Sequence, residues 1–469
     1  MDSHDPALDT PVTELMPTLQ RLRTAWQQHR PDARQRRDDL QRLHAAFKAR
    51  LDQMAEVISA DFGGRSRHES LLADGMTVLN EIAHLRGQLR SWMRPRRVGA
   101  GWRLWPARAQ VRPQPVGVVG VISPWNYPVN LALIPLATAI AAGNHVLLKP
   151  SEHTPRTAQW LRTLLAEVFP PDRVAVVTGG PDLAAAFSGL PLDHLVFTGS
   201  TAVGKKVMAA AAKHLVPVTL ELGGKSPAII CPDYPLDKAA ARLATGKWFN
   251  GGQTCIAPDY VLVDAARRDA FIDAFIAETR RRYSQANAGD FTNIIHAGQQ
   301  RRLLDYLQDA RQRGLTVHTI LETGGPDAVP PSVVVQPGND ALVMQEEIFG
   351  PILPVIGYDA LDDAIAFVQR RDRPLALYPF SHDRGTIDRI LSQLLSGGVT
   401  VNDTLLHFAA NRLPFGGVGP SGMGAYHGRA GFDGMSKLLP VLQQSRLAAS
   451  DRLKPPYANV DRLIRLLLR

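Results

Sequence analysis

The sequence predicts an α/β protein with two open, mostly parallel sheets and a smaller β element. Short apolar runs typical of strands alternate with amphipathic runs typical of helices from about residue 116 to residue 395. Such alternation indicates βαβ units around a parallel sheet. It comes in two series that meet near Leu220. A chain of 469 residues is also too long for one ordinary core, so we predict two α/β domains.

The first region, residues 1–97, is predicted to be helical. It is rich in Ala, Leu, Arg, Gln and Glu, and apolar residues such as Leu40, Leu43 and Phe47 repeat at the helical period. We interpret it as antiparallel helices of the first domain. Around Gln110 the sequence becomes short and β-like in texture, and we predict a β-hairpin over residues 98–115.

The two α/β series follow the hairpin. In the first domain, residues 116–220, the alternating runs are 145–148, 154–168, 173–177, 195–198 and 202–214. In the second domain, residues 221–398, they are 228–230, 236–249, 260–263, 267–283, 361–370, 375–380 and 387–395. We predict that residues 399–440 return to the β element, with a Gly-rich loop at 413–424.

Residues 441–469 form the predicted C-terminal tail. The stretch 460–469 mixes Leu and Ile with Arg and Asp, and it is far shorter than the roughly 20 apolar residues of a membrane-spanning helix. We predict a terminal helix that packs on its own chain or on a partner subunit. Attachment to a membrane surface is the alternative, and no transmembrane segment is expected.

Composition is that of an ordinary folded protein. The net charge of +9 comes from 53 Lys and Arg against 44 Asp and Glu, and we interpret the Arg clusters as a solvated basic face, with attraction of anionic ligands as the alternative. No nucleic-acid recognition motif accompanies them. The cysteines, Cys231 and Cys255, are too few for a disulfide framework. The polar N-terminus shows no secretory signal, so we expect a cytoplasmic protein.

The most informative segment is Phe249 to Cys255, which reads FNGGQTC. A helix-like run stops at two glycines, which let the backbone turn sharply, and a cysteine follows among small polar residues. A nucleophilic thiol needs donors that favour its thiolate and room for a substrate. Cys255 is therefore the candidate nucleophile, whereas Cys231, in an apolar run, is interpreted as a core residue.

Two further segments carry groups that such a thiol would need. Glu221 ends a strand-like run and precedes two glycines, so its carboxylate can face a crevice and act as a general base for water attacking a thioester. Asn126 lies between Pro124 and Pro128, where its amide could donate to an oxyanion. Taken alone, each residue has an ordinary structural reading: a surface or ion-paired Glu, and an Asn that caps a turn.

Signals for a dinucleotide are spread more widely. Lys149 and Glu152 follow a strand and could hold ribose hydroxyls, and residues 199–204, GSTAVG, follow a strand and open a helix whose amides could meet a pyrophosphate. Glycines at 417, 419 and 422 match G-x-G-x-x-G. No βα unit surrounds that match, so we interpret it as a structural loop.

Taken together, these segments resemble the aldehyde dehydrogenase superfamily in order and spacing from about Gln41 to Lys437. Finer features are similar to the class-three branch and especially to bacterial coniferyl aldehyde dehydrogenases. These features are residues 92–97, WMRPRR; 252–260, GQTCIAPDY; 398–407, GVTVNDTLLH; and 422–428, GMGAYHG. The resemblance implies two Rossmann-like domains, one for NAD and one catalytic, with a β oligomerisation element and a homodimer.

The resemblance also implies a role at each matching position. Cys255 would be the nucleophile and Glu221 the general base, and the Asn126 side chain would form the oxyanion hole with the Cys255 backbone amide. The remaining positions would contact the cofactor: Trp125 lines its cleft, Lys149 and Glu152 hold the adenosine ribose, Gly199, Ser200 and Gly204 face the pyrophosphate, and Glu347 and Phe349 meet the nicotinamide ribose and ring. No metal is expected.

The implied reaction is NAD-dependent oxidation of an aldehyde to a carboxylic acid through a Cys255 thioester. An aromatic substrate such as coniferyl aldehyde, or another apolar aldehyde, is the family's implication. Glu152 should repel a 2′-phosphate and so favour NAD, although class-three relatives with this Glu also use NADP. The alternatives are an acylating enzyme that passes the thioester to coenzyme A, or a reductase; a general base at Glu221 disfavours both. A third alternative is a non-catalytic basic binding protein on the same fold.

Two positions depart from the family pattern: Gly251, and Pro379, where the family often has an aromatic or polar residue. Relatives often carry Ala or Ser where this chain has Gly251. We expect a looser turn before Gln253, with no reacting group lost.

Overall fold

A computed structural model describes residues 9–283, 289–321 and 328–446, together with single residues at 455, 457, 460, 461, 464, 465 and 468. The terminal helix predicted over 460–469 therefore falls largely outside the described residues. Within the described part, no helix is both long enough and apolar enough to cross a membrane.

The amino-terminal region is helical, as predicted, and its helices lie against the first sheet. They are α1 (Leu15–Gln28), α2 (Ala33–Lys48), α3 (Leu51–Asp61), α4 (Arg67–Ser70) and α5 (Thr77–Trp92), with a π-helical turn at Leu71–Met76 just before α5. Apolar residues of α2, α3 and α5 contribute to one core with the sheet, and those of α1 contribute to another. The helical periodicity of the sequence thus corresponds to buried helix faces.

The first sheet has six strands in the order β15-β7-β6-β3-β4-β5. Its elements in chain order are β3 (Val118–Ile122), α6 (Asn130–Ala142), β4 (His145–Lys149), α7 (Pro155–Val168), β5 (Val174–Val176), α8 (Pro181–Ser188), β6 (His194–Thr198), α9 (Thr201–Ala212), β7 (Val218–Glu221) and, much later, β15 (Gly422–Met423). All pairings are parallel except that of β15 with β7. Every residue of α6 is buried, which explains why this helix is apolar all round.

The second sheet has seven strands in the order β10-β11-β12-β9-β8-β13-β14. Its elements are β8 (Pro227–Ile230), α10 (Leu236–Trp248), β9 (Tyr260–Asp264), α11 (Arg268–Arg282), α12 (Ala297–Gln312), β10 (Val317–Thr319), β11 (Ser332–Val335), α13 (Leu342–Gln345), β12 (Ile352–Tyr358), α14 (Leu361–Gln369), β13 (Ala376–Phe380), α15 (Arg384–Gln393) and β14 (Gly398–Val399). Only β10 runs antiparallel to its neighbour.

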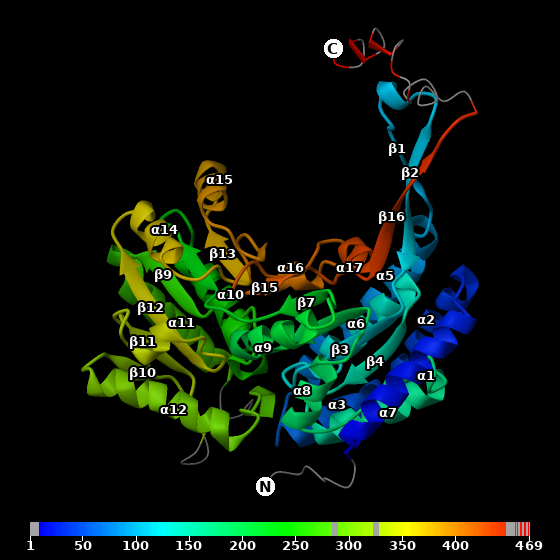
Figure 1. Ribbon diagram of the computed structural model, residues 1–469. Helices are drawn as coiled ribbons and strands as arrows, with labels where there is room; N and C mark the ends of the chain where they lie inside the picture. Colours follow the sequence, from blue (N-terminus) through cyan, green and yellow to red (C-terminus); the bar gives the residue numbers. More distant parts are fainter. Residues whose placement is uncertain are drawn as a thin grey trace.

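A small antiparallel sheet forms an arm that projects from the body of the molecule (Figure 1). It pairs β1 (Arg96–Val98) and β16 (Ser436–Gln443) with β2 (Arg108–Pro115). Between β14 and β16 the chain passes through α16 (Leu406–Ala409), β15 and α17 (Gly428–Gly434). The chain predicted to return to the β element from residue 399 therefore first pairs with the six-stranded sheet and reaches the arm only at Ser436.

The predicted fold class is confirmed: two mostly parallel open sheets flanked by helices, plus a small β element. In the six-stranded sheet the chain runs from β3 outward to β5 and then crosses back to β6 and β7. The strand order therefore reverses between β3 and β6. In such open sheets, ligands bind beyond the carboxyl ends of the strands at this reversal point.

Candidate active site

The carboxyl ends of β3, β4, β6 and β7 meet at one edge of the six-stranded sheet. Ile122 is in register with Lys149 on β4 and with Phe197 on β6, and Thr198 is in register with Glu221 on β7. Asn126, Glu152, Ser200 and Glu221 follow or end these strands. The predicted site residues of the first domain therefore lie along one edge, beside the point where the strand order reverses.

The loop that carries Cys255 is shaped by three residues with left-handed backbone. After α10 ends, Asn250, Gly251 and Gly252 have φ values of 57°, 61° and 77°. A Cβ at Gly251 would lie 2.7 Å from the carbonyl oxygen of Thr292, and one at Gly252 would lie 2.3 Å from that of Gly350. Both glycines are therefore needed for the close approach of the neighbouring backbone. The turn is tightly enclosed, which corrects our expectation of a looser one.

Cys255 is half-buried, so its thiol remains within reach of a substrate. Burial raises the pKa of this thiol, and the nearby carboxyls of Glu347 and Glu221 raise it further; the backbone amides of Cys255 and Ile256 act in the opposite direction. The expectation that its surroundings favour the thiolate is therefore wrong for the protein groups alone, without a bound cofactor or substrate. The main reason is burial of the thiol, and the two acidic side chains add to it. Adding the sulfur to a substrate requires a proton acceptor.

Glu221 supplies one such group. Its side chain is 2% exposed, and neither carboxyl oxygen has a hydrogen-bond partner among the described residues. Burial raises its pKa well above the usual value. Buried polar atoms are normally satisfied by protein or water, so a buried carboxyl without a protein partner is suited to exchange a proton with a water molecule.

Tyr426 and His427 were not assigned a role from sequence, although both belong to the quoted GMGAYHG segment. Burial raises the pKa of the Tyr426 hydroxyl well above its usual value, and the nearby Glu221 and Cys255 raise it further. That hydroxyl and both ring nitrogens of His427 are buried without a partner in the described part of the chain. The signal available in the sequence was the motif itself, but its spacing from Glu221 gave no indication that β15 would bring it alongside β7.

Asn126 is held next to the Cys255 loop. Its side-chain Nδ2 donates to the backbone carbonyl of Gln253 at 3.1 Å, and the residue is 3% exposed. The neighbouring Tyr127 hydroxyl lies 2.5 Å from the Thr254 Oγ1. The structure therefore places Asn126 against the loop that carries Cys255, and its role in an oxyanion hole stays a prediction.

Glu347 and Phe349 reach the same pocket from the second domain. A Cβ at Gly223 would lie 1.9 Å from the Glu347 Oε2, so the carboxyl rests on the glycine turn that follows Glu221. Burial, with the charge of Asp259, raises the pKa of Glu347 to about 8. Phe349 has a φ of 51°, a strained value for a bulky residue, and its ring meets that of Trp125 edge to face at 5.4 Å.

The remaining predicted residues fit a dinucleotide. Lys149 Nζ donates to Glu152 Oε2 at 2.5 Å. Burial acts to raise the pKa of Glu152, but the charge and hydrogen bond of Lys149, with smaller contributions, together outweigh it and the pKa is lowered. This carboxylate is therefore ionised and able to accept hydrogen bonds from hydroxyl groups. Ser200 caps α9, accepting from the amide of Val203. A Cβ at Gly199 would lie 2.5 Å from the Phe197 side chain, and a Cβ at Gly204 would lie 2.6 Å from the Leu222 side chain. Both positions are therefore closely packed.

A half-buried thiol, an unpartnered carboxyl and a side-chain amide thus lie near the point where the strand order of a dinucleotide-type sheet reverses. The aldehyde dehydrogenase family profile matches residues 13–439. The chain belongs to this family and is an aldehyde-oxidising enzyme that takes a nicotinamide cofactor.

Individual relatives agree with this assignment. The chain is 47% identical to "Probable coniferyl aldehyde dehydrogenase" of Pseudomonas aeruginosa over 97% of this chain and 96% of that protein. It is 43% identical to "Coniferyl aldehyde dehydrogenase" of Pseudomonas sp. strain HR199, over 90% and 89% of the two chains. Aldehyde dehydrogenases of the class-three branch, named as family 3 members, are also similar.

Solved structures share the fold. A substrate-bound Staphylococcus aureus AldH superposes with a TM-score of 0.91 and 35% identity, covering 98% of this chain and 100% of that one. Indole-3-acetaldehyde dehydrogenase AldA of P. syringae, solved with NAD⁺, gives a TM-score of 0.85 and 25% identity over 93% and 90% of the chains. The predicted family and its two-domain architecture are confirmed.

Proposed function

We propose that this enzyme oxidises an aromatic aldehyde such as coniferyl aldehyde to its carboxylic acid, with NAD as the preferred cofactor and Cys255 as the carrier of the acyl group. The observation that supports it most strongly is the convergence of Cys255, Glu221 and Asn126 from separate segments into one pocket. The overall change is aldehyde, NAD⁺ and water to carboxylic acid, NADH and a proton.

The protein groups have distinct tasks in this scheme. The Cys255 thiol passes its proton to a neighbouring carboxyl, and its sulfur adds to the carbonyl carbon. The Asn126 amide and the Cys255 backbone amide then donate to the resulting oxyanion, and losing one such donor typically costs about 2.7 to 4 kcal/mol. The bound nicotinamide supplies the acceptor for the hydride that leaves this carbon. The carbon is now a thioester carbonyl on Cys255.

Hydrolysis of the thioester is the task of Glu221. Its ionised carboxyl takes a proton from water, the resulting hydroxide attacks the thioester carbon, and the carbon–sulfur bond breaks to return Cys255. A general base contributes about 100- to 10,000-fold. Because both Glu221 oxygens are free of other partners in the described structure, no hydrogen bond has to break before water binds.

The cofactor and substrate preferences rest on separate observations. The ionised Glu152 beside Lys149 can accept from ribose hydroxyls and would repel a 2′-phosphate, which favours NAD over NADP. The aromatic substrate follows from the two coniferyl aldehyde dehydrogenase relatives. A homodimer and a cytoplasmic location complete the proposal.

The proposal is tested by measuring product and cofactor turnover for the wild-type enzyme and for Cys255→Ser. We expect one NADH per acid formed, a higher kcat/KM for coniferyl aldehyde than for short alkyl aldehydes, and loss of at least 1,000-fold in the variant, on the order of the covalent contribution seen when a catalytic nucleophile is removed. Retention of full NAD-linked oxidation by Cys255→Ser would show the nucleophile assignment to be wrong. Equal turnover of alkyl aldehydes would remove the substrate assignment alone.

A further inference from the structure

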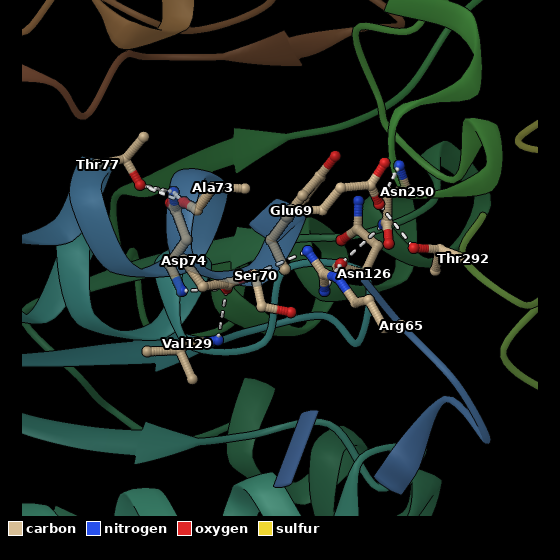
Figure 2. A network of polar contacts seen from close by, with 12 residues as sticks. Arg65, Glu69, Ser70, Ala73, Asp74, Thr77, Asn126, Val129, Asn250 and Thr292 are labelled. Atoms are coloured by element: carbon tan, nitrogen blue, oxygen red, sulfur yellow. Dashed lines mark hydrogen bonds and ion pairs between the residues drawn. The ribbon is translucent and has the colours of Figure 1, made fainter. Parts of the chain in front are cut away.

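A buried polar network, with no assigned role, surrounds the backbone of Asn126 (Figure 2). It consists of Arg65 and Glu69 from the segment around α4, Asp74 from the π-helical turn, Asn250 from the cysteine loop, and Thr292. Within it, Glu69 and Thr292 are hydrogen-bonded although they lie 223 residues apart in sequence. None of the network residues belongs to the motifs that define the reacting groups, except Asn250.

Arg65 joins the oxyanion-hole loop to the helical region. Its Nη1 donates to the carbonyl oxygen of Asn126 at 3.0 Å, and its Nη2 donates to Asp74 Oδ2 at 3.0 Å. The side chains of both Arg65 and Asp74 are fully buried. A guanidinium presents its donors in a rigid planar fork, so binding Asp74 with one arm fixes where the other arm meets Asn126.

Asp74 holds the other end of the same loop. Its Oδ1 accepts from the backbone amides of Val129 at 3.2 Å and Asn130 at 2.9 Å, where α6 begins. Those amides would otherwise lack partners at a helix start. Residues 126–130 are therefore clamped at their first carbonyl by Arg65 and at their last two amides by Asp74.

Asn250 clamps Asn126 from the cysteine side. Its Nδ2 donates to the carbonyls of Asn126 at 3.0 Å and Gln253 at 3.1 Å, and its own backbone amide donates to Glu69 Oε2 at 3.0 Å. Glu69 also accepts from the Thr292 hydroxyl at 2.6 Å. The backbone carbonyls of Asn126 and Gln253 therefore both accept hydrogen bonds from the side-chain amide of Asn250.

The Asn126 side chain is oriented by this arrangement. An amide NH₂ group has two hydrogens; one is directed to the Gln253 carbonyl, which fixes the plane of the amide and leaves the second hydrogen available. We propose that Arg65 and Asn250 are positioning residues that hold the Asn126 amide in the orientation in which its second hydrogen donates to the oxyanion formed at Cys255. This inference rests on the proposed role of Asn126.

Two conservative variants isolate the positioning effect. Arg65→Lys keeps a cation beside Asp74 but lacks the second arm of the fork that reaches Asn126. In Asn250→Gly, the glycine adopts the left-handed backbone at this position without strain. The variant removes the side-chain amide that joins the carbonyls of Asn126 and Gln253, and it leaves the buried Arg65–Asp74 ion pair undisturbed. A matched control is Arg36→Lys: Arg36 is also buried and donates to the carbonyls of Pro31, Ala141 and Ala142, away from the pocket.

The measurement uses the full-length enzyme without cofactor and follows two reactions of Cys255. An activated aryl ester acylates the thiol through a tetrahedral oxyanion, whereas iodoacetamide alkylates it by displacement at carbon, with no oxyanion. We expect both site variants to slow acylation about 10-fold, less than the roughly 100- to 1,000-fold for losing an oxyanion donor outright, and to leave alkylation unchanged. Arg36→Lys should change neither rate while the protein is folded.

A double-mutant cycle with Asn126→Ala then tests the route of the effect. If Arg65 acts through Asn126, Arg65→Lys should slow acylation less than 2-fold in the Asn126→Ala background, because coupled residues are not additive. An equal fold-loss in both backgrounds, or no loss in either site variant, would overturn the positioning role while leaving the proposed function intact. Failure of the ester to modify Cys255 in the wild type would overturn both.

Discussion

At the residue scale, the pocket is defined by acidic groups that share it with a thiol. Glu221 and Glu347 both have a raised pKa, and each raises the pKa of Cys255. Burial is the main cause of both raised carboxyl pKa values, because a buried carboxyl is disfavoured in its charged form. Each carboxyl can accept the proton of the Cys255 thiol only in its ionised form, so the reaction depends on one of them being ionised when the thiol reacts.

Glu221→Gln should slow thioester hydrolysis by about 100- to 10,000-fold, the usual contribution of a general base. Because burial raises the pKa of Glu221, its ionised fraction increases with pH, and wild-type hydrolysis of the acyl group should accelerate from acidic towards alkaline pH. The variant should lose this dependence. Stopped-flow measurement detects the slow hydrolysis in the variant directly, as a burst of NADH followed by a slow steady state. A variant that hydrolyses as fast as wild type, with the same pH profile, would rule out Glu221 as the base.

Glu347→Gln should change the pH dependence of stability. A carboxyl whose folded pKa of about 8 lies above its unfolded value stabilises the fold fully at low pH and loses that contribution as pH rises through 8. Each pKa unit corresponds to about 1.36 kcal/mol. Relative to wild type, the variant should therefore gain up to a few kcal/mol in unfolding free energy between pH 5 and pH 9, measured by urea denaturation. A constant difference across this range would contradict the raised pKa.

Sequence reasoning at this scale proposed the reacting groups but not the residues that support them. Cys255, Glu221 and Asn126 could be proposed because each lies in a short segment with turn residues and a family likeness. Arg65 and Asp74 lie in a helical region with no motif, and their partners are backbone atoms of residues 126, 129 and 130. Backbone acceptors and donors carry no sequence signal, so this clamp became visible only in three dimensions.

At the element scale, the turn at residues 249–252 positions Cys255. Gly251→Ala places a side chain at a φ of 61°, which costs about 1 to 2 kcal/mol, and its Cβ would also press on the Thr292 carbonyl. We expect lower stability and slower acylation of Cys255. The control is Gly87→Ala in α5, where no atom lies within 4 Å of the added Cβ and the helix should gain about 0.5 to 1 kcal/mol. Urea denaturation gives the unfolding free energy of each variant. Equal values for Gly251→Ala and Gly87→Ala would show that the turn tolerates a side chain.

The alternation of elements was predictable, but their long-range pairing was not. The apolar strands and amphipathic helices of residues 116–398 alternate at clear periods, so the parallel sheets followed from the pattern. Gly422 and Met423 are too short a strand to be recognised, and their pairing with Glu221 and Leu220 joins segments about 200 residues apart. That pairing is what brings Tyr426 and His427 towards the base.

At the scale of the whole molecule, the arm is the feature that a partner subunit would explain. It projects from the body (Figure 1), and it carries exposed apolar residues on β16, Leu438 at 38% and Leu442 at 52%. Exposed apolar residues grouped on one element mark interaction surfaces. This agrees with the homodimer expected from the class-three likeness.

Leu442→Asp should therefore weaken the dimer. Sedimentation velocity of the wild type should give a dimer, and the variant should shift towards monomer at micromolar concentration, since a buried unpaired charge at an interface is costly. Lys437→Asp on the same strand serves as the control for charge alone, because Lys437 is already polar and exposed. A wild type that sediments only as monomer would contradict the expected assembly.

The central claim is that Cys255 carries the acyl group. The most direct test is rapid quenching of Glu221→Gln after mixing with NAD⁺ and coniferyl aldehyde, followed by peptide mass spectrometry. The account predicts one acyl group per chain, located on the peptide that contains Cys255, in an amount equal to the NADH released in the burst. NADH released with no acyl group on Cys255, or with the acyl group on another residue, would contradict it.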